Sequence, residues 1–322
     1  MTIEPWYFQA DDIQSFLDAP ERGQQTIHCS PTGSGKTVIQ AFIAKENMDA
    51  GRPTAILTPR FEIFQQTVNT IEKICGHGTV GMMRAGEYWD RSKPIHVVSW
   101  PTLIKRLQKS DVWRPDVHSL LVDECHLSMA PRIRDVLFDF IPRAKIHGWS
   151  ATPVRPTGHG LGSFYTGIKH VTTVKRLTEE GYLAPLEYWA GAYADVQGLK
   201  INGGDYEVKK LSQRSTTLVG DVLDNWMRLA SDRKTLVFAV DVRHAEALCD
   251  RFIRCGIAAG VIHSHQEPEQ RHATVEKFRA GELKVLVNVM IASYGFDVPD
   301  VTCVVNARRT RSLVLWLQML GR

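Results

Sequence analysis

Residues 30–37 combine glycines, hydroxyls and one lysine in an order that suits phosphate binding: Ser30-Pro31-Thr32-Gly33-Ser34-Gly35-Lys36-Thr37. A short β-branched strand is expected before them at 26–29 and an apolar helix after them at 38–44. The glycines let backbone N–H groups turn toward phosphate oxygens, Lys36 reaches the β and γ phosphates, and the Thr37 hydroxyl can ligate Mg²⁺. Ser30 stands where the general pattern has glycine, and its small side chain fits there. The segment predicts a nucleotide site, with a plain glycine-rich turn as the alternative.

Two adjacent acids, Asp123 and Glu124, follow a short strand expected at 119–122. Burying two carboxylates at the end of a strand is costly without a cation or another partner, and Mg²⁺ supplies that partner. In a P-loop enzyme Asp123 would hold the metal and Glu124 would orient or deprotonate the attacking water. Together with residues 30–37, the acids predict hydrolysis of a nucleoside triphosphate. His126 could be an ordinary structural histidine.

Other polar groups follow further expected strands. Pro59 and Arg60 come after the strand at 54–58, and Ser99 ends the strand at 95–99. In open α/β sheets ligands bind at the carboxyl ends of the strands, where basic and hydroxyl groups suit the phosphates and sugars of a nucleic acid. The segment 146–153 is expected to be another strand, and it ends in the two hydroxyls of Ser150 and Thr152. They could change partners as the nucleotide changes, although a serine–threonine turn before proline is the alternative.

Gln9 lies upstream of the glycine loop, where several ATP motors place an aromatic residue and a glutamine against adenine. Its amide can pair with both the N6 donor and the N7 acceptor of that base. An exposed helix glutamine is an equally good interpretation of this position.

The composition bounds the class of protein. A chain of 322 residues exceeds the ~250–300 residues at which single cores stop growing, so two α/β domains are expected. No apolar run approaches the roughly 18 residues of a membrane span, and the first residues lack a secretory signal. The six cysteines contain no CxxC pair and are expected to be reduced, in a soluble cytoplasmic protein. The net charge of +4 is compatible with a polyanionic partner without requiring one.

Alternating strand and helix patterns divide the chain into three parts. Residues 1–173 are expected to form the nucleotide-binding domain, with its exit in the glycine- and proline-rich stretch 153–173. Residues 174–217 are expected to be a connector with a small β element, strand-like at 186–190 and a loop at 197–205. Residues 218–322 repeat the α/β alternation without a phosphate loop, which predicts a second parallel-sheet domain without its own nucleotide cradle.

The ordered set of segments resembles the motifs of superfamily 2 DEAD/DEAH-box helicases. The matching segments are PTGSGKT at 31–37, LTPR at 57–60, VVSWPTL at 97–103, DECH at 123–126, SATP at 150–153, SYGFDVPD at 293–300 and QMLGR at 318–322. The last two most resemble RadD-like and phage-type DNA helicases and, more distantly, the motor subunits of restriction enzymes.

The resemblance implies two tandem RecA-like domains, with ATP and Mg²⁺ in a cleft between them and nucleic acid across both. It also implies roles for the matching residues at the nucleotide: Gln9 would read adenine, Gly33, Ser34, Gly35, Lys36 and Thr37 would hold the phosphates, Thr37 and Asp123 would hold the metal, and Glu124 would activate water. Gly295 and Asp297 would face the cleft, and Gln318 and Arg322 would approach the phosphates. Nucleic acid would contact Pro59, Arg60, Ser99 and Ser293, and Ser150 and Thr152 would couple the two sites. Family members carry a second arginine after QMLGR, whereas this chain ends at Arg322. We therefore expect a second domain that stops within its last motif, and slow hydrolysis.

The sequence thus predicts an ATP-dependent helicase or translocase that acts on DNA rather than RNA, single-stranded or with a duplex junction. Two alternatives stay open: the motor portion of a restriction-modification enzyme, and a nucleic-acid-binding module with little ATP turnover. The sequence does not predict polarity, oligomeric state or protein partners.

Overall fold

The computed structural model describes residues 3–21, 23–59, 61–108, 117–140, 144–155, 159–192, 194–202, 204–290, 298 and 300–321, without the side chains of 61, 62, 107, 108, 140 and 268. The chain divides into two compact units, Met1–Pro185 and Leu186–Arg322. The division falls inside the segment that the sequence predicts to be a connector.

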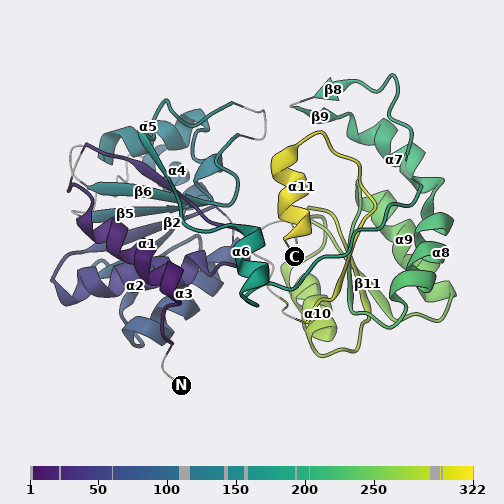
Figure 1. The fold of residues 1–322 in the computed structure, drawn as a ribbon, viewed down its shortest axis with the longest axis horizontal. Coiled ribbons are helices and arrows are strands. Elements are labelled where there is room, and N and C mark those ends of the chain that lie inside the picture. The colour runs from purple at the N-terminus through teal and green to yellow at the C-terminus, as the bar shows by residue number, and fades with distance from the viewer. Residues whose placement is uncertain are drawn as a thin grey trace. The chain divides into compact units, whose positions relative to one another are not determined.

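The first unit contains a seven-stranded sheet in the order β3-β4-β2-β5-β6-β1-β7 (Figure 1). Every strand pair in it is parallel. The strands are β1 (Thr26–Cys29), β2 (Thr54–Thr58), β3 (Val80–Met83), β4 (Ile95–Ser99), β5 (Ser119–Asp123), β6 (Lys145–Ser150) and β7 (Gly167–His170). Strands β2, β5 and β6 are buried along their whole length, as expected for central parallel strands with both faces covered.

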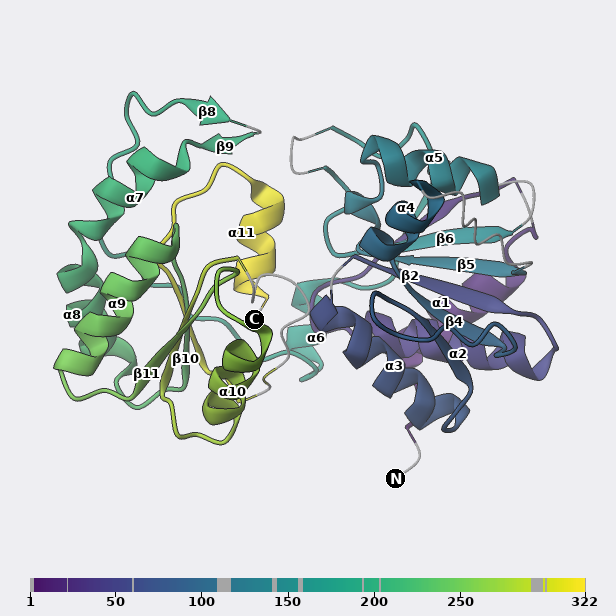
Figure 2. The ribbon, with the colours of Figure 1, turned by 180° about the vertical axis from the view of Figure 1, so that it is seen from behind.

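Helices cover both faces of this sheet (Figure 2). The helices of this unit are α1 (Tyr7–Asp18), α2 (Lys36–Asp49), α3 (Phe61–Cys75), α4 (Trp100–Gln108), the short 3₁₀ helix η1 (Cys125–Leu127), α5 (Pro131–Phe140) and α6 (Val174–Glu179). One core joins the sheet to α1, α2 and α3 through residues such as Phe16, Ile39 and Phe64. A second core on the opposite face includes Trp100 and Leu137, from α4 and α5. The sheet is therefore the rigid middle layer of the unit.

The parallel strands bring the sites predicted from the sequence to one edge. Cys29, which leads into the glycine loop, pairs in register with Ser150, and Asp123 pairs with Trp149. Thr58 pairs with Ser99 on the other side of β5. Because all these strands run in the same direction, the segments that follow them leave the sheet at its carboxyl edge.

The second unit contains a four-stranded parallel sheet in the order β11-β12-β10-β13. Its strands are β10 (Thr235–Phe238), β11 (Ala259–Ile262), β12 (Val285–Asn288) and β13 (Cys303–Asn306), and its helices are α7 (Val208–Thr216), α8 (Val219–Ala230), α9 (Val242–Arg254), α10 (Pro268–Arg279) and α11 (Leu313–Leu320). Two cores cover the two faces: α8 and α9 contribute Trp226 and Phe252 to one, and α10 and α11 contribute Phe278 and Met319 to the other. The predicted class, two tandem parallel-sheet α/β domains, is confirmed.

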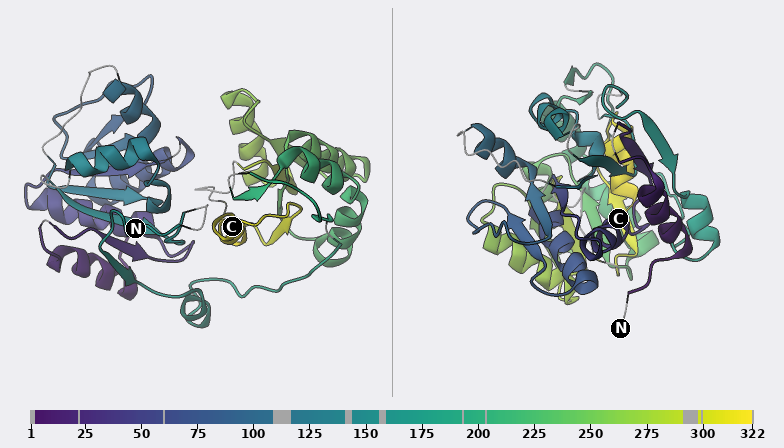
Figure 3. Two further views of the ribbon diagram at one scale, coloured as in Figure 1. Left: turned by 90° about the horizontal axis from the view of Figure 1, so that it is seen from above. Right: turned by 90° about the vertical axis from the view of Figure 1, so that its left-hand side faces the viewer.

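Some local predictions were wrong. The described residues between α6 and β8 (Ile201–Asn202), 180–192 and 194–200, contain no helix or strand, so no strand forms at 186–190 (Figure 3). Tyr188 and Trp189 in that run are 67% and 66% exposed. The predicted loop at 197–205 contains β8 and leads into β9 (Asp205–Tyr206), which form an antiparallel hairpin. The strands β3 and β7 and the helix α7 are present in the structure, although the sequence analysis had not predicted them.

Within the residues that the structure describes, no helix is long and apolar enough to cross a membrane.

Candidate nucleotide site

The glycine loop connects β1 to α2 with the backbone conformation that its glycines predict. Gly33 and Gly35 have φ angles of 83° and 77°, in the left-handed region that side chains with a Cβ rarely adopt. Gly35 is the N-cap of α2, so the first N–H groups of the helix, which have no partner within the helix, lie at the loop. The Ser30 hydroxyl donates to Ser34 Oγ at 2.6 Å, and Ser34 Oγ donates to the Pro31 carbonyl at 2.7 Å. The loop is thus held in a cradle suited to phosphate.

Gln9 contacts this loop directly and is 3% exposed, so it is not the exposed glutamine of the alternative interpretation. Its Nε2 donates to the Ser34 carbonyl at 2.8 Å, while its Oε1 accepts from the Trp6 backbone N–H at 2.9 Å. A Cβ on residue 35 would lie 2.4 Å from Gln9 Nε2, so this amide would have to move if residue 35 carried a side chain. Helix α1 and the glycine loop therefore fit together at this glutamine.

Lys36 is the first residue of α2 and is partly buried. Its ammonium donates to the Ser30 carbonyl at 3.4 Å and to the Pro31 carbonyl at 3.2 Å. Both distances are long for a charged donor, whose hydrogen bonds are typically about 2.7–2.9 Å. A phosphate at the loop would be the stronger partner for this ammonium. Thr37 follows on α2 and is also partly buried.

The paired acids lie at the end of β5 and are buried, with exposures of 5% for Asp123 and 8% for Glu124. Burial, followed by repulsion from Glu124, raises the pKa of Asp123 to about 7, and Lys36 opposes this rise. Glu124 has φ 46° and ψ 49°, a left-handed conformation that is costly for a residue with a side chain. Its Oε2 makes no hydrogen bond to the described residues.

The acid pair suits Mg²⁺. Mg²⁺ is bound in such sites by one or two carboxylates together with phosphate oxygens and water, rather than by a cage of protein ligands. Among the described residues no group of three or more His, Cys, Asp or Glu side chains could hold a metal. A cation there would remove the electrostatic cost that raises the pKa of Asp123.

A buried chain of polar groups connects the acids to β6. His126 Nδ1 lies 3.4 Å from Glu124 Oε2 and 2.9 Å from Ser150 Oγ. Ser150 Oγ in turn accepts from the Thr152 backbone N–H at 3.0 Å. Burial lowers the pKa of His126, which favours a neutral imidazole at this point. The buried Thr152 hydroxyl makes no hydrogen bond to the described residues, so it is free to take a new partner.

The remaining predicted residues are divided between the two units. Pro59 and Ser99 are partly buried at the ends of β2 and β4, which are neighbours in the sheet. Gln318 is 2% exposed on α11 of the second unit. The other five predicted positions lie outside the described residues: Arg60, Ser293, Gly295, Asp297 and Arg322.

Sequence reasoning missed Gln40, which lies on α2 one turn after Lys36 and is fully buried. Its amide faces the carboxyl of Asp123, and the interaction between them opposes the rise in the pKa of Asp123. A buried glutamine needs partners. The only signal in the sequence was its spacing of four residues from Lys36, which places both on one helix face.

Two family models match the chain. Residues 2–155 match the model described as the res subunit of type III restriction enzymes, and residues 218–322 match the helicase conserved C-terminal domain.

Curated relatives match over most of this chain. The 51.5 kDa protein of a Lactococcus phage (isolate 7-9) is 30% identical over 91% of this chain and 61% of its own length. The Saccharomyces cerevisiae protein named "Putative ATP-dependent helicase IRC3" is 27% identical over 98% of this chain and 48% of its own length. The chain spans between 48% and 61% of the lengths of these and two further helicase relatives.

Solved structures share the fold. A fragment titled as a putative HsdR subunit of a type I restriction enzyme from Vibrio vulnificus has a TM-score of 0.70 at 21% identity, and covers 99% of this chain and 60% of that chain. Dbp5 of S. cerevisiae, bound to RNA and ADP BeF3, has a TM-score of 0.65 at 16% identity and covers 99% of this chain and 80% of that chain. The two parallel-sheet units therefore have the fold of RecA-like helicase domains. With the motif set, the glycine loop, the paired acids and both family matches in agreement, the chain belongs to the superfamily 2 helicases.

Proposed function

We propose that this protein is an ATP-dependent helicase or translocase that moves along DNA. The observation that carries the proposal is the joint presence of a phosphate cradle after β1 and two buried acids after β5, strands that lie on either side of β6. One acid can hold Mg²⁺ and the other can accept a proton from water, and together these are the parts that hydrolysis of a nucleoside triphosphate needs.

In this proposal Lys36 contacts the β and γ phosphates, Thr37 and Asp123 hold Mg²⁺, and Glu124 orients and deprotonates the attacking water. The strained backbone of Glu124 supports its role, because such conformations are concentrated at functional sites. The side chain of Glu124 also has an oxygen without a hydrogen bond to the described residues, which a water molecule could occupy.

Gln9 is proposed to read adenine from its position on α1, beside the glycine loop. To do so its amide would exchange at least one present contact, to the Ser34 carbonyl or the Trp6 N–H, for the base.

Nucleic acid is proposed to contact the carboxyl edge of the first sheet at Pro59, Arg60 and Ser99, and the second unit at Ser293. Support comes from the register of β2 and β4, which places Pro59 directly after the residue paired with Ser99. DNA is proposed over RNA because residues 2–155 match a restriction-enzyme family, although other relatives are named as RNA helicases.

Coupling between nucleotide and nucleic acid is proposed to run through Ser150 and Thr152. The contact of Ser150 with His126 and the bond from the Thr152 N–H to Ser150 would change when the γ phosphate leaves. Gly295, Asp297, Gln318 and Arg322 are proposed to act on the nucleotide from a domain at 218–322, with residues 1–173 as the first domain and 174–217 as a connector. A cytoplasmic location is likewise proposed.

The second candidate is the motor portion of a restriction enzyme, which the family match of residues 2–155 favours. This candidate shares the same ATP chemistry. It differs in needing a nuclease or methylase from another segment or subunit.

Displacement of streptavidin from the end of biotinylated single-stranded DNA tests the proposal. We expect ATP-dependent displacement by the parent protein, weaker displacement from RNA of the same sequence, and none by Lys36→Ala. Equal activity on both polymers would refute the preference for DNA. ATP hydrolysis that DNA stimulates, without any displacement, would refute movement and leave only an ATPase.

A further inference from the structure

Asp12 is a fully buried carboxylate in the middle of α1, and both of its oxygens have partners. His28 Nδ1 lies 2.6 Å from Oδ1, and the indole N–H of Trp149 donates to Oδ2 at 3.0 Å. The Lys169 ammonium lies 3.5 Å from Oδ1. A buried carboxylate without such partners would cost several kcal/mol. An apolar side chain could cover the sheet at this point without them, so the network does more than fill space.

The partners of Asp12 come from the two strands that lead into the nucleotide site. His28 is on β1, two residues before Ser30 and the glycine loop, and Trp149 is on β6, directly before Ser150. The two side chains also stack, with ring centroids 4.5 Å apart and planes at 18°. One carboxylate therefore holds α1 to both strands at the level where they approach the site.

Gln9 lies one turn before Asp12 on the same buried face of α1, because residues three apart are neighbours on a helix. Three residues rise about 4.5 Å along the axis, so the hydrogen bonds of Asp12 restrain the helix close to the Gln9 amide. That amide donates to the Ser34 carbonyl at 2.8 Å and occupies the space that a Cβ on residue 35 would take. A small movement of α1 would therefore displace the amide from the loop.

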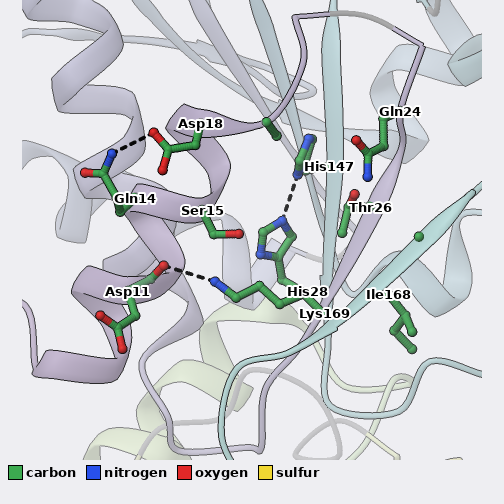
Figure 4. A pocket seen from close by; sticks show the side chains of 12 residues that line it. Asp11, Gln14, Ser15, Asp18, Gln24, Thr26, His28, His147, Ile168 and Lys169 are labelled. Carbon is green, nitrogen blue, oxygen red and sulfur yellow. Dashed lines mark hydrogen bonds between the residues drawn. The ribbon is translucent and has the colours of Figure 1, made fainter.

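Figure 4 shows the outer side of this network, in a groove of about 650 Å³ between α1 and β7. The His28 ring lies at the bottom of the groove, with its Nε2 2.7 Å from His147 Nδ1. Lys169 crosses from β7 and donates to the Asp11 carbonyl at 3.0 Å. The network is thus one layer below solvent. Among the described residues, Lys169 is the lysine or arginine that forms an ion pair with Asp12. The side chains of this network come from α1, β1, β6 and β7, so the packing of these four elements sets their relative positions.

We propose that Asp12 is a positioning residue of the nucleotide site, which sets the preference for adenine by holding Gln9 against the glycine loop. The inference rests on the proposed function, in which Gln9 reads adenine. Asp12 bonds to His28 and Trp149, and in this proposal it acts on the site through α1.

A double-mutant cycle tests the inference. The equilibrium affinities of ATP and GTP are measured for the parent, Gln9→Ala, Asp12→Ala and the double variant, each with its melting temperature. We expect Gln9→Ala and Asp12→Ala each to lower the ATP-to-GTP affinity ratio by about tenfold, and the double variant to lower it no further.

Asp12→Asn should keep the preference even if Asp12→Ala folds poorly. The asparagine carbonyl can accept from Trp149, and its amide can donate to the other tautomer of His28. Asp11 is an exposed carboxylate on the same helix, and Asp11→Asn is therefore the matched control. It should change neither the ATP-to-GTP affinity ratio nor the melting temperature.

The outcomes separate the inference from the proposed function. If Gln9→Ala loses the preference while Asp12→Ala only melts at lower temperature with an unchanged ratio, Asp12 is merely structural and the inference is overturned. If the parent has no preference for ATP, or Gln9→Ala keeps it, adenine reading by Gln9 is wrong and the inference falls with it. Additive losses in the double variant would also overturn it, because Asp12 would then not act through Gln9.

Discussion

Replacing Asp123 by asparagine should stabilise the nucleotide-free protein at neutral and alkaline pH. Burial and the adjacent Glu124 raise the pKa of the Asp123 carboxyl from 3.8 to about 7 in the folded chain. The folded chain therefore binds this proton more tightly than the unfolded chain does. The free energy of unfolding of the parent should fall as the pH rises from about 4 to about 7.

The size of the effect follows from the same numbers. A rise of the pKa from 3.8 to about 7 corresponds to about 4 kcal/mol of unfolding free energy. Asparagine keeps the shape of the side chain and carries no charge. Asp123→Asn should therefore exceed the parent in stability by about 4 kcal/mol at pH 8 and by about 2 kcal/mol at pH 5.

Urea unfolding at pH 5 and pH 8, without Mg²⁺ or nucleotide, measures this difference. Asp139→Asn, on the exposed side of α5, is the control and should give the same stability as the parent at both values. Adding Mg²⁺ and ATP should stabilise the parent more than Asp123→Asn, because only the carboxylate can hold the metal. An Asp123→Asn variant no more stable than the parent at pH 8 would refute the reasoning.

Three further outcomes follow from the structure. Gly148→Ala should destabilise the fold by about 1–3 kcal/mol in urea unfolding, because its Cβ would lie 2.5 Å from Cys125 Cβ, whereas Gly160→Ala, with open space around it, should be neutral. Ser150→Ala should leave ATP affinity unchanged and reduce the stimulation of hydrolysis by DNA about tenfold, since it removes the buried partner of His126; unchanged stimulation would exclude the coupling role. DNA affinity should fall steeply with salt and vary little with base sequence in titrations at several salt concentrations, and strong sequence discrimination would argue against backbone contacts.

The central strands could be predicted because their signals are local. Runs such as Ile95–Ser99 are β-branched and apolar, and burial of both faces agrees with that pattern. The edge strand β7, Gly167–His170, has only alternating partial exposure and starts with glycine, so it resembled a loop. Leu186–Ala190 has strand-like residues but no neighbouring strand to bond to, and tertiary context overrode its propensity.

The site was predictable where one short segment carries the chemistry. The glycine loop and the acids Asp123 and Glu124 each follow a strand, so the parallel sheet alone brings them to one edge. The contacts of Asp12 with His28 and Trp149 could not be predicted, because they join residues up to 137 positions apart through side chains. Only the register of β1 and β6 makes these residues neighbours.

The most direct test of the account compares ATP hydrolysis by the parent and Glu124→Gln, each with saturating DNA and with ATP affinity measured separately. Glutamine keeps the shape of the side chain and cannot accept the proton of the attacking water. We predict nearly unchanged ATP affinity and a kcat lower by about 10²-fold or more. Hydrolysis by Glu124→Gln at the parental rate would contradict the assignment of this site as the centre of ATP hydrolysis.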